Sequence, residues 1–165
     1  MKSVLLVRHA KSSWDHFGMA DFDRPLNDRG KEDGPKMAKR LLDKKVSIDT
    51  FISSPAKRAK KTAQLFATEF GLNKDHIILV PELYHAASET FLTVIASAPP
   101  QSNSIILFSH NPGITDFVNS LTEVKVDNMP TCSIYAVKAN IKQWADFGHA
   151  PKEFWFFDYP KSVAQ

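Results

Sequence analysis

Two histidines and two arginines follow short apolar segments of this sequence, and their side chains suit the chemistry of a phosphoryl group. Arg8-His9 follows VLLV, Arg58 follows the apolar segment that ends at Ser54, and His110 follows IILF. A guanidinium offers a planar set of donors that matches phosphoryl oxygens, and an uncharged imidazole can attack phosphorus. These residues predict a site that binds a phosphoryl group and transfers it through a covalent intermediate. The pattern alone does not rank the two histidines.

The apolar segments themselves predict the strands that would bring these residues together. Residues 4–7, 50–54 and 105–108 are typical of strands buried on both faces, and residues 77–80 are a fourth candidate. Because helical patterns alternate with them, we predict a single-domain, three-layer α/β/α fold with a central, mostly parallel sheet. Ligands bind beyond the C-terminal ends of such strands, so Arg8, His9, Arg58 and His110 are expected in one pocket.

Four helices are predicted between and after these strands. Ser54-Pro55 and Asn111-Pro112 each provide an N-cap and a first helical residue, and Ser88 begins a third helix. A fourth helix passes through residues 37–42, with Pro35 either at its start or kinking it. The two helices that start at proline would add free backbone N–H groups to an anion site.

The C-terminal third is expected to extend the sheet or cover its edge. Residues 132–137, 144–147 and 154–157 are strand-like, and we interpret the last as a core or edge strand. The single cysteine, Cys132, is expected to be a small buried residue within a strand.

Composition bounds the other possibilities. A chain of 165 residues is expected to form one domain, 1–165, and its net charge of +3 is too small to predict nucleic-acid binding. With one cysteine, no signal-peptide pattern and no apolar run near the roughly 20 residues that span a bilayer, we expect a cytoplasmic protein without membrane association. The histidines lack metal-ligand spacing, and no phosphate-loop or serine-hydrolase motif occurs, so no metal or cofactor is expected.

Four motifs resemble those of one family. RHA at 8–10, SSPAKRAKKTA at 53–63 and SHNPG at 109–113 look like the three signatures of the histidine phosphatase superfamily, which is phosphoglycerate mutase-like in fold. PLNDRG at 25–30 resembles the segment that follows the first signature. The short chain and the RHAKSSW opening are more similar to the small phosphohistidine phosphatase (SixA-like) branch than to the larger mutases. Ala10 departs from the glycine of many members.

The resemblance implies a role for individual residues. His9 would be the phosphorylated nucleophile, and Arg8, Arg58 and His110 would line the phosphate pocket. His110 would then be a charge clamp on the transferred oxygens rather than an attacker. Glu82, in PELYHA, lies where the superfamily often has a carboxylate that acts as general acid. Residues expected to contact the substrate or form the rim of the pocket are Asn111, Ser12, Arg24 and Lys11.

We therefore predict a metal-independent phosphatase with a phosphohistidine intermediate, acting on a phosphohistidine in a partner protein. One alternative is a phosphatase for a small phosphomonoester, which would depend on Glu82 as its acid. A second alternative is a non-catalytic module that binds phosphoproteins, although the intact His9 argues against it. A mutase is less favoured, because it would need a more enclosed site to retain the phosphoryl group.

Overall fold

The computed structural model describes residues 1–15 and 17–162, and within them six strands form one sheet. In space the strands follow the order β3-β2-β4-β1-β5-β6. Their bounds are β1 Lys2–Arg8, β2 Thr50–Ser53, β3 Ile78–Leu79, β4 Ser104–Ser109, β5 Ile134–Ala139 and β6 Lys152–Asp158.

The sheet is mixed, with a parallel half that carries the predicted strands. β3, β2, β4 and β1 are parallel to one another, whereas β5 runs antiparallel to β1 and β6 runs antiparallel to β5. The strands predicted at 4–7, 50–54 and 105–108 are confirmed. The segment at 77–80 forms only a two-residue edge strand, and residues 154–157 belong to the opposite edge strand, as expected.

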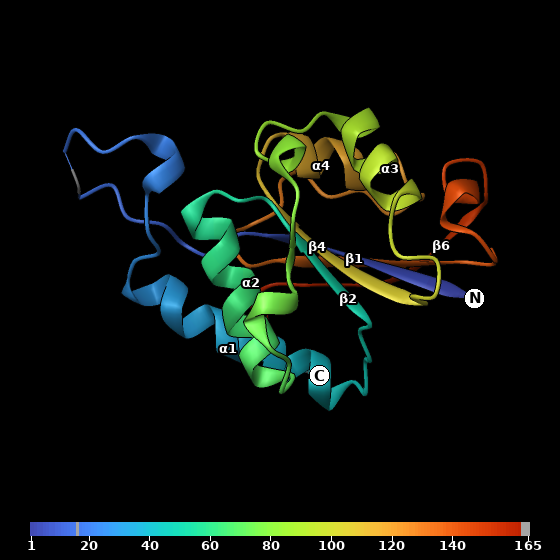
Figure 1. Ribbon diagram of the computed structural model, residues 1–165, viewed down its shortest axis with the longest axis horizontal. Coiled ribbons are helices and arrows are strands. Elements are labelled where there is room, and N and C mark those ends of the chain that lie inside the picture. Colours follow the sequence, from blue (N-terminus) through green and yellow to red (C-terminus); the bar gives the residue numbers. More distant parts are fainter. Residues whose placement is uncertain (16, 163–165) are drawn as a thin grey trace.

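Helices cover both faces of the sheet, which gives the predicted three layers. α1 (Asp28–Asp43) and α2 (Lys57–Glu69) lie on one face, and α3 (Ser88–Ala96) and α4 (Gly113–Val118) lie on the other (Figure 1). Single 3-10 turns occur at Asp21–Asp23, Lys74–His76, Pro81–Leu83 and Trp144–Asp146.

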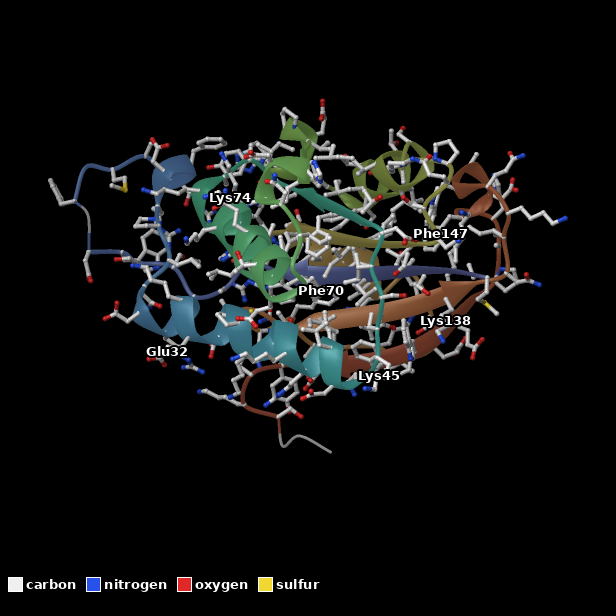
Figure 2. All side chains as sticks on the ribbon, turned by 60° about the horizontal axis from the view of Figure 1, so that its bottom comes forward. Glu32, Lys45, Phe70, Lys74, Lys138 and Phe147 are labelled. Atoms are coloured by element: carbon white, nitrogen blue, oxygen red, sulfur yellow. The ribbon has the colours of Figure 1, made fainter. Side chains whose placement is uncertain are left out.

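The continuous apolar runs form strands because both of their faces are covered. Val4 and Leu6 of β1 pack in the core that contains α3 and α4, while Leu5 and Val7 pack in the core that contains α1 and α2. All four side chains are fully buried. Side chains fill the space between helices and sheet, and charged residues such as Glu32 lie at the outside (Figure 2).

Three helix predictions differ from the structure at their starts or ends. α2 begins at Lys57 with Ala56 as N-cap, because the Ser54 hydroxyl instead accepts from the Ala56 N–H at 3.2 Å. α4 begins at Gly113 and has only six residues, so the predicted helix does not extend to residue 121. α1 begins at Asp28, where Asn27 caps it, and Pro35 therefore lies inside the helix rather than at its start.

Two predictions in the C-terminal third are wrong. Residues 144–146 form a 3-10 turn instead of a strand, with Trp144 buried, because an aromatic run satisfies the core in either conformation. Cys132 is buried as expected but precedes β5, and its φ of 61° is a turn conformation that no strand uses.

Candidate active site

The C-terminal ends of β1, β2 and β4 meet at one edge of the sheet, with β4 between the other two. Arg8 pairs in register with Ser109, and the His9 N–H donates to the Ser109 carbonyl oxygen at 3.1 Å. The Ser54 N–H donates to the Phe108 carbonyl oxygen at 3.0 Å. The parallel register therefore places the residues that follow all three strands side by side, as the sequence predicts.

These strand ends surround a cavity of about 210 Å³. Most of its wall is polar or cationic, and two imidazoles face each other across it, with the ring centroids of His9 and His110 5.2 Å apart. The lining residues are Arg8, His9, Lys11, Ser12, Trp14, Arg24, Arg58, His110, Asn111 and Thr131. A space of this size and charge suits a phosphoryl group.

The surroundings of His9 fix its tautomer. Its Nδ1 lies 2.7 Å from the Ala10 carbonyl oxygen, which can only accept, so Nδ1 carries the proton. Nε2 then has a lone pair, toward which Arg58 Nε donates at 3.3 Å. Burial lowers the pKa of His9 to about 3, and the charges of Arg58, Arg8 and Arg24 act in the same direction. His9 is thus an uncharged imidazole near neutral pH, with its lone pair on Nε2.

The first turns of α2 connect Arg58 to the turn after β1. Thr62, one helical turn after Arg58, donates to the Arg58 carbonyl oxygen at 2.7 Å and accepts from the Ala10 N–H at 2.9 Å. The carbonyl oxygen of the same residue, Ala10, accepts the hydrogen bond from His9 Nδ1–H. Thr62 therefore holds the turn that orients the His9 ring, from within the SSPAKRAKKTA motif.

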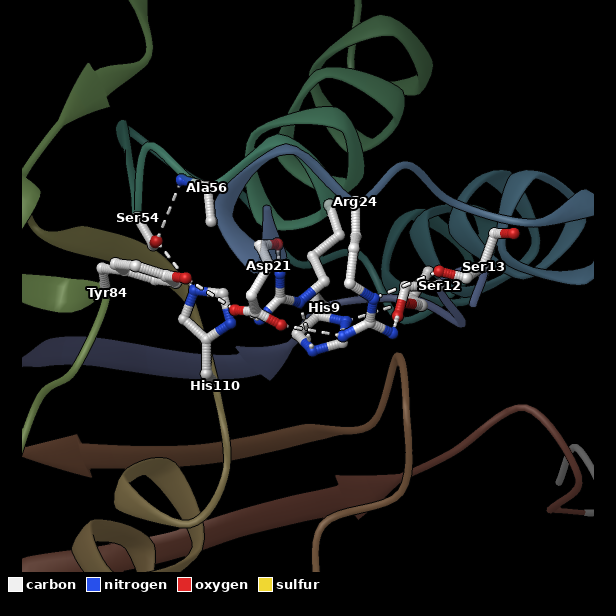
Figure 3. Close-up of polar contacts among 11 residues, drawn as sticks. His9, Ser12, Ser13, Asp21, Arg24, Ser54, Ala56, Tyr84 and His110 are labelled. Carbon is white, nitrogen blue, oxygen red and sulfur yellow. Dashed lines mark hydrogen bonds and ion pairs between the residues drawn. The ribbon is translucent and has the colours of Figure 1, made fainter. Parts of the chain in front are cut away.

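His110 is held from the β2 side of the cavity. Its Nε2 lies 2.8 Å from the Ser54 hydroxyl, while its Nδ1 is buried without a hydrogen-bond partner among the described residues. In Figure 3 this second nitrogen faces the centre of the cluster. Burial lowers the pKa of His110 to about 3, and His9 and Arg58 contribute. We expected His110 to be a charged clamp on the phosphoryl oxygens, but the lowered pKa makes it a neutral side chain near neutral pH.

Arg8 and Arg24 bring further guanidiniums to the cavity. Arg8 donates from one terminal nitrogen to the Met129 carbonyl oxygen at 2.9 Å, and its buried Nε has no partner among the described residues. Arg24 donates to the Ser12 hydroxyl at 2.6 Å and to the Ser13 carbonyl oxygen at 3.1 Å (Figure 3). Its guanidinium carbon lies 3.2 Å from the centroid of the Trp14 ring.

One carboxylate, Asp21, joins two of these guanidiniums. Its oxygens lie 3.0 Å from Arg24 and 3.0 Å from Arg58, and the Tyr84 hydroxyl donates to it at 2.6 Å (Figure 3). These contacts, the Tyr84 hydrogen bond foremost, hold the pKa of Asp21 far below its ordinary value. Asp21 is therefore an anion that partly neutralises the cationic pocket.

Two glycines of the recognised motifs allow close backbone approaches around the site. A Cβ on Gly30, in PLNDRG, would collide with the backbone of Lys11, next to the His9 turn. A Cβ on Gly113, in SHNPG, would collide with the Ala86 carbonyl oxygen. Both motifs thus pack backbone against backbone where the cavity is built.

Comparison with known proteins agrees with this geometry. A family model described as histidine phosphatase superfamily (branch 1) matches residues 4–85, which contain the first two signatures and the PLNDRG segment. The chain belongs to the histidine phosphatase superfamily. An uncharacterized chloroplastic protein of Arabidopsis thaliana is 26% identical over 153 residues, covering 88% of this chain and 70% of that protein.

Solved structures of SixA proteins share the fold over nearly the whole chain. The SixA protein of Agrobacterium tumefaciens is 27% identical, with a TM-score of 0.80 over 96% of this chain and 98% of that one. A protein histidine phosphatase SixA in complex with tungstate is 22% identical, with a TM-score of 0.81 over 96% and 97% of the two chains. The present chain is therefore similar in fold to the SixA-like branch of the superfamily.

All the residues predicted for the phosphatase site except Glu82 line the cavity around His9. Glu82 is exposed in the 3-10 turn after β3 and lines a separate, mainly apolar hollow beside α3. Asn111 lines the cavity, but its amide group already donates to Asn128 at 2.8 Å and to the Met129 carbonyl oxygen at 3.2 Å. Its side chain therefore ties α4 to the segment before β5.

Sequence reasoning missed Asp21, Tyr84 and Thr62. The spacing of three residues between Asp21 and Arg24 could have suggested a local ion pair. Nothing in the sequence points to Tyr84, which lies 63 residues from its partner Asp21. Thr62 lies within a recognised motif, and its spacing of four from Arg58 on a helix was the available signal.

The structure also bears on membrane and metal binding within the described residues. None of the helices in residues 1–15 and 17–162 is long and apolar enough to cross a membrane. In the same part of the chain, no three His, Cys, Asp or Glu side chains are grouped so that they could hold a metal ion.

Proposed function

We propose that this superfamily member removes the phosphoryl group from a phosphohistidine of a partner protein and passes it through His9 to water. The observation that carries the proposal is the state of His9: an uncharged imidazole whose Nε2 lone pair faces a cavity with three guanidiniums. A neutral, oriented nucleophile beside fixed positive charge is what attack on an anionic phosphoryl group requires.

In the first step, the Nε2 lone pair of His9 forms a bond to phosphorus while the phosphorus–nitrogen bond of the substrate breaks. The leaving imidazole keeps the electron pair of that bond and is neutral if it arrives protonated. Arg8, Arg58 and Arg24 bind the three transferred oxygens, and their hydrogen bonds strengthen as charge builds there. Ser12 positions Arg24, with which it already shares a hydrogen bond of 2.6 Å.

In the second step, water attacks phosphorus, the bond to His9 Nε2 breaks, and inorganic phosphate leaves. The unpartnered Nδ1 of His110 can donate to a phosphoryl oxygen when the Ser54 hydroxyl donates to its Nε2. A bound dianion would also raise the pKa of His110, because an adjacent negative charge favours the protonated ring. His110 would then become the charged clamp that the sequence predicts.

A SixA protein of the same fold was solved in complex with tungstate, a tetrahedral oxyanion like phosphate, and a ligand of that kind is what the proposal expects for this chain. A substrate with a phosphorylated imidazole also needs little acid catalysis, which agrees with the position of Glu82 outside the cavity. The role of Glu82 as general acid remains a prediction, and it belongs with the alternative of a small phosphomonoester. That alternative is favoured by a neighbouring hollow of about 270 Å³, which shares His110 and Asn111 with the cavity and could receive a small leaving group.

Turnover on matched substrates tests the proposal. Phosphate release is measured from a histidine-phosphorylated protein, free phosphohistidine, glucose 6-phosphate and 3-phosphoglycerate, with wild-type enzyme and His9→Ala. We expect kcat/KM to be at least about tenfold higher for phosphohistidine in protein than for either ester, and no release by His9→Ala. Preference for the esters would reject the substrate class. Binding of phosphoprotein without turnover would favour the non-catalytic module instead.

A further inference from the structure

The loop between β1 and α1 exposes an unusual number of large apolar side chains beside the active site. We define it as the 13–23 loop, of which all residues but 16 are described. Phe17 is fully exposed, Trp14 is 78% exposed, and Met19 and Phe22 are 39% and 38% exposed. The loop projects from the body of the molecule beyond the start of α2 (Figure 1). In the rest of the described chain, exposed large apolar residues are single or form one adjacent pair: Met1, Leu42, Leu72, Ile78-Leu79 and Val124.

The base of the 13–23 loop is fixed to the catalytic cavity. Trp14 lines that cavity and stacks on Arg24, and Phe22 packs edge-on against Tyr84 with ring centroids 5.0 Å apart. Asp21, which lies between Trp14 and Phe22 in the sequence, is hydrogen-bonded to Arg58 and Tyr84. Trp14 therefore stands at the edge of the cavity, and Phe22 is anchored beside it on Tyr84. Phe17 and Met19 do not line the cavity and are carried outward on the same loop.

We propose that the 13–23 loop is a docking surface for the protein substrate, and that it contacts an apolar surface around the phosphorylated side chain. The proposal rests on the function proposed above and adds the element that recognises the protein. A small metabolite held in the 210 Å³ cavity would leave Phe17 and Met19, which do not line it, exposed to solvent on the projecting loop (Figure 1). Aromatic residues and Met are enriched where proteins bind proteins, and clustered exposed apolar groups mark such sites.

The charge of the loop indicates the rest of the partner's surface. Residues 13–23 contain three aspartates and no lysine or arginine. Asp21 is paired with arginines of the cavity, whereas Asp15 and Asp23 have no ion-pair partner among the described residues and give the loop its acidic surface. Anionic lipid attracts basic segments and repels acidic ones, so the charge argues against a membrane as the occupant. It favours instead a protein whose apolar patch is bordered by Lys or Arg. The cationic cavity would bind the phosphoryl group, and the acidic loop would contact the Lys or Arg residues around the phosphorylated side chain of the partner.

The test separates protein recognition from chemistry. The variant is Phe17→Ser/Met19→Ser, because neither side chain lines the cavity. The control is Leu72→Ser, which removes a side chain that is 41% exposed. Leu72 follows the C-terminal end of α2, whereas Arg58 lies in the first turn of that helix. The probes are free phosphohistidine and two versions of one small carrier protein, phosphorylated with phosphoramidate on a single surface histidine. In one version leucines and lysines flank that histidine, and in the other the leucines are glutamates.

We expect the double variant to lower kcat/KM for the leucine-flanked carrier about tenfold, mainly through KM, and to leave free phosphohistidine turnover unchanged. Leu72→Ser should change neither value, and the glutamate-flanked carrier should be a poor substrate for the wild type. Equal turnover of the leucine-flanked carrier by wild type and double variant would overturn the docking proposal. Absence of turnover on all three probes by the wild type would instead reject the proposed function.

Other occupants of the loop give distinct results that would also overturn the proposal. One is binding of the wild type, but not of the double variant, to vesicles of phosphatidylcholine and phosphatidylglycerol. Another is a solution mass twice the 18.5 kDa of the chain that returns to the monomer value in the double variant, which would identify a second copy as the partner.

Discussion

Acid should destabilise this protein through the two active-site histidines, because the fold holds both rings uncharged. Burial lowers the pKa of His9 and of His110 from 6.5 to about 3. The unfolded chain therefore binds protons below pH 6.5 that the folded chain does not bind until about pH 3. The stability that these groups contribute is present above pH 6.5 and is lost as the pH falls from 6.5 toward 3.

The size of this effect follows from the shifts. One pH unit corresponds to about 1.36 kcal/mol for each group that differs by a full proton between the two states. Lowering the pH to 5 should thus remove about 2 kcal/mol of unfolding free energy per histidine, and about 4 kcal/mol for the pair. The unfolding free energy of most domains is roughly 5–15 kcal/mol, so a loss of that size is a large part of the total.

Urea unfolding at pH 7, 6 and 5, in a buffer without phosphate, measures this loss. We compare the wild type with His9→Gln, His110→Gln and the double variant. The quantity compared is the change in unfolding free energy between pH 7 and pH 5, so a difference in stability at pH 7 does not affect the comparison. Each substitution should reduce the pH dependence by about half of the histidine contribution. If the wild type and the double variant lose equal stability between pH 7 and 5, the reasoning about buried neutral imidazoles is wrong.

Three further substitutions test the site. Asp21→Asn removes an anion that competes with the substrate for Arg24 and Arg58. Tungstate binding, measured by calorimetric titration, should therefore become about fivefold tighter, which is roughly 1 kcal/mol. Weaker binding would show that Asp21 mainly orders the guanidiniums. Thr62→Val leaves the N–H of the turn after β1 without its acceptor, and should lower the unfolding free energy by about 1–3 kcal/mol and kcat more than it changes KM. Wild-type stability and kcat in Thr62→Val would count against the positioning role. Glu82→Gln should keep phosphohistidine turnover within about twofold of the wild type, and a loss above about tenfold would establish Glu82 as a proton donor.

The parallel half of the fold could be predicted because its strands are buried on both faces. VLLV and IILF have no polar residue until the chain reaches the edge of the sheet, so the end of each apolar run marks the end of a strand. Arg8, His9 and His110 could then be placed together by topology alone. Which residues lie at the strand ends is thus encoded locally, as a change from apolar to polar.

The features that could not be predicted depend on partners distant in sequence. Ser54 does not cap α2, and its hydroxyl bonds instead to the Ala56 N–H and to His110, 56 residues away. Asp21 is part of the site only because Arg58 and Tyr84 reach it from other elements. The apolar residues of the 13–23 loop contradict the usual preference for burial, so Phe17 could be recognised as exposed only in three dimensions.

Trapping the phosphorylated enzyme tests the central claim most directly. The enzyme is mixed with histidine-phosphorylated protein, quenched within milliseconds in base, where phosphohistidine survives, and digested for mass spectrometry. The account predicts one acid-labile phosphoryl group on Nε2 of His9, present in His110→Gln and absent in His9→Gln. A phosphoryl group on another residue, or full turnover by His9→Gln without any phosphoenzyme, would contradict it.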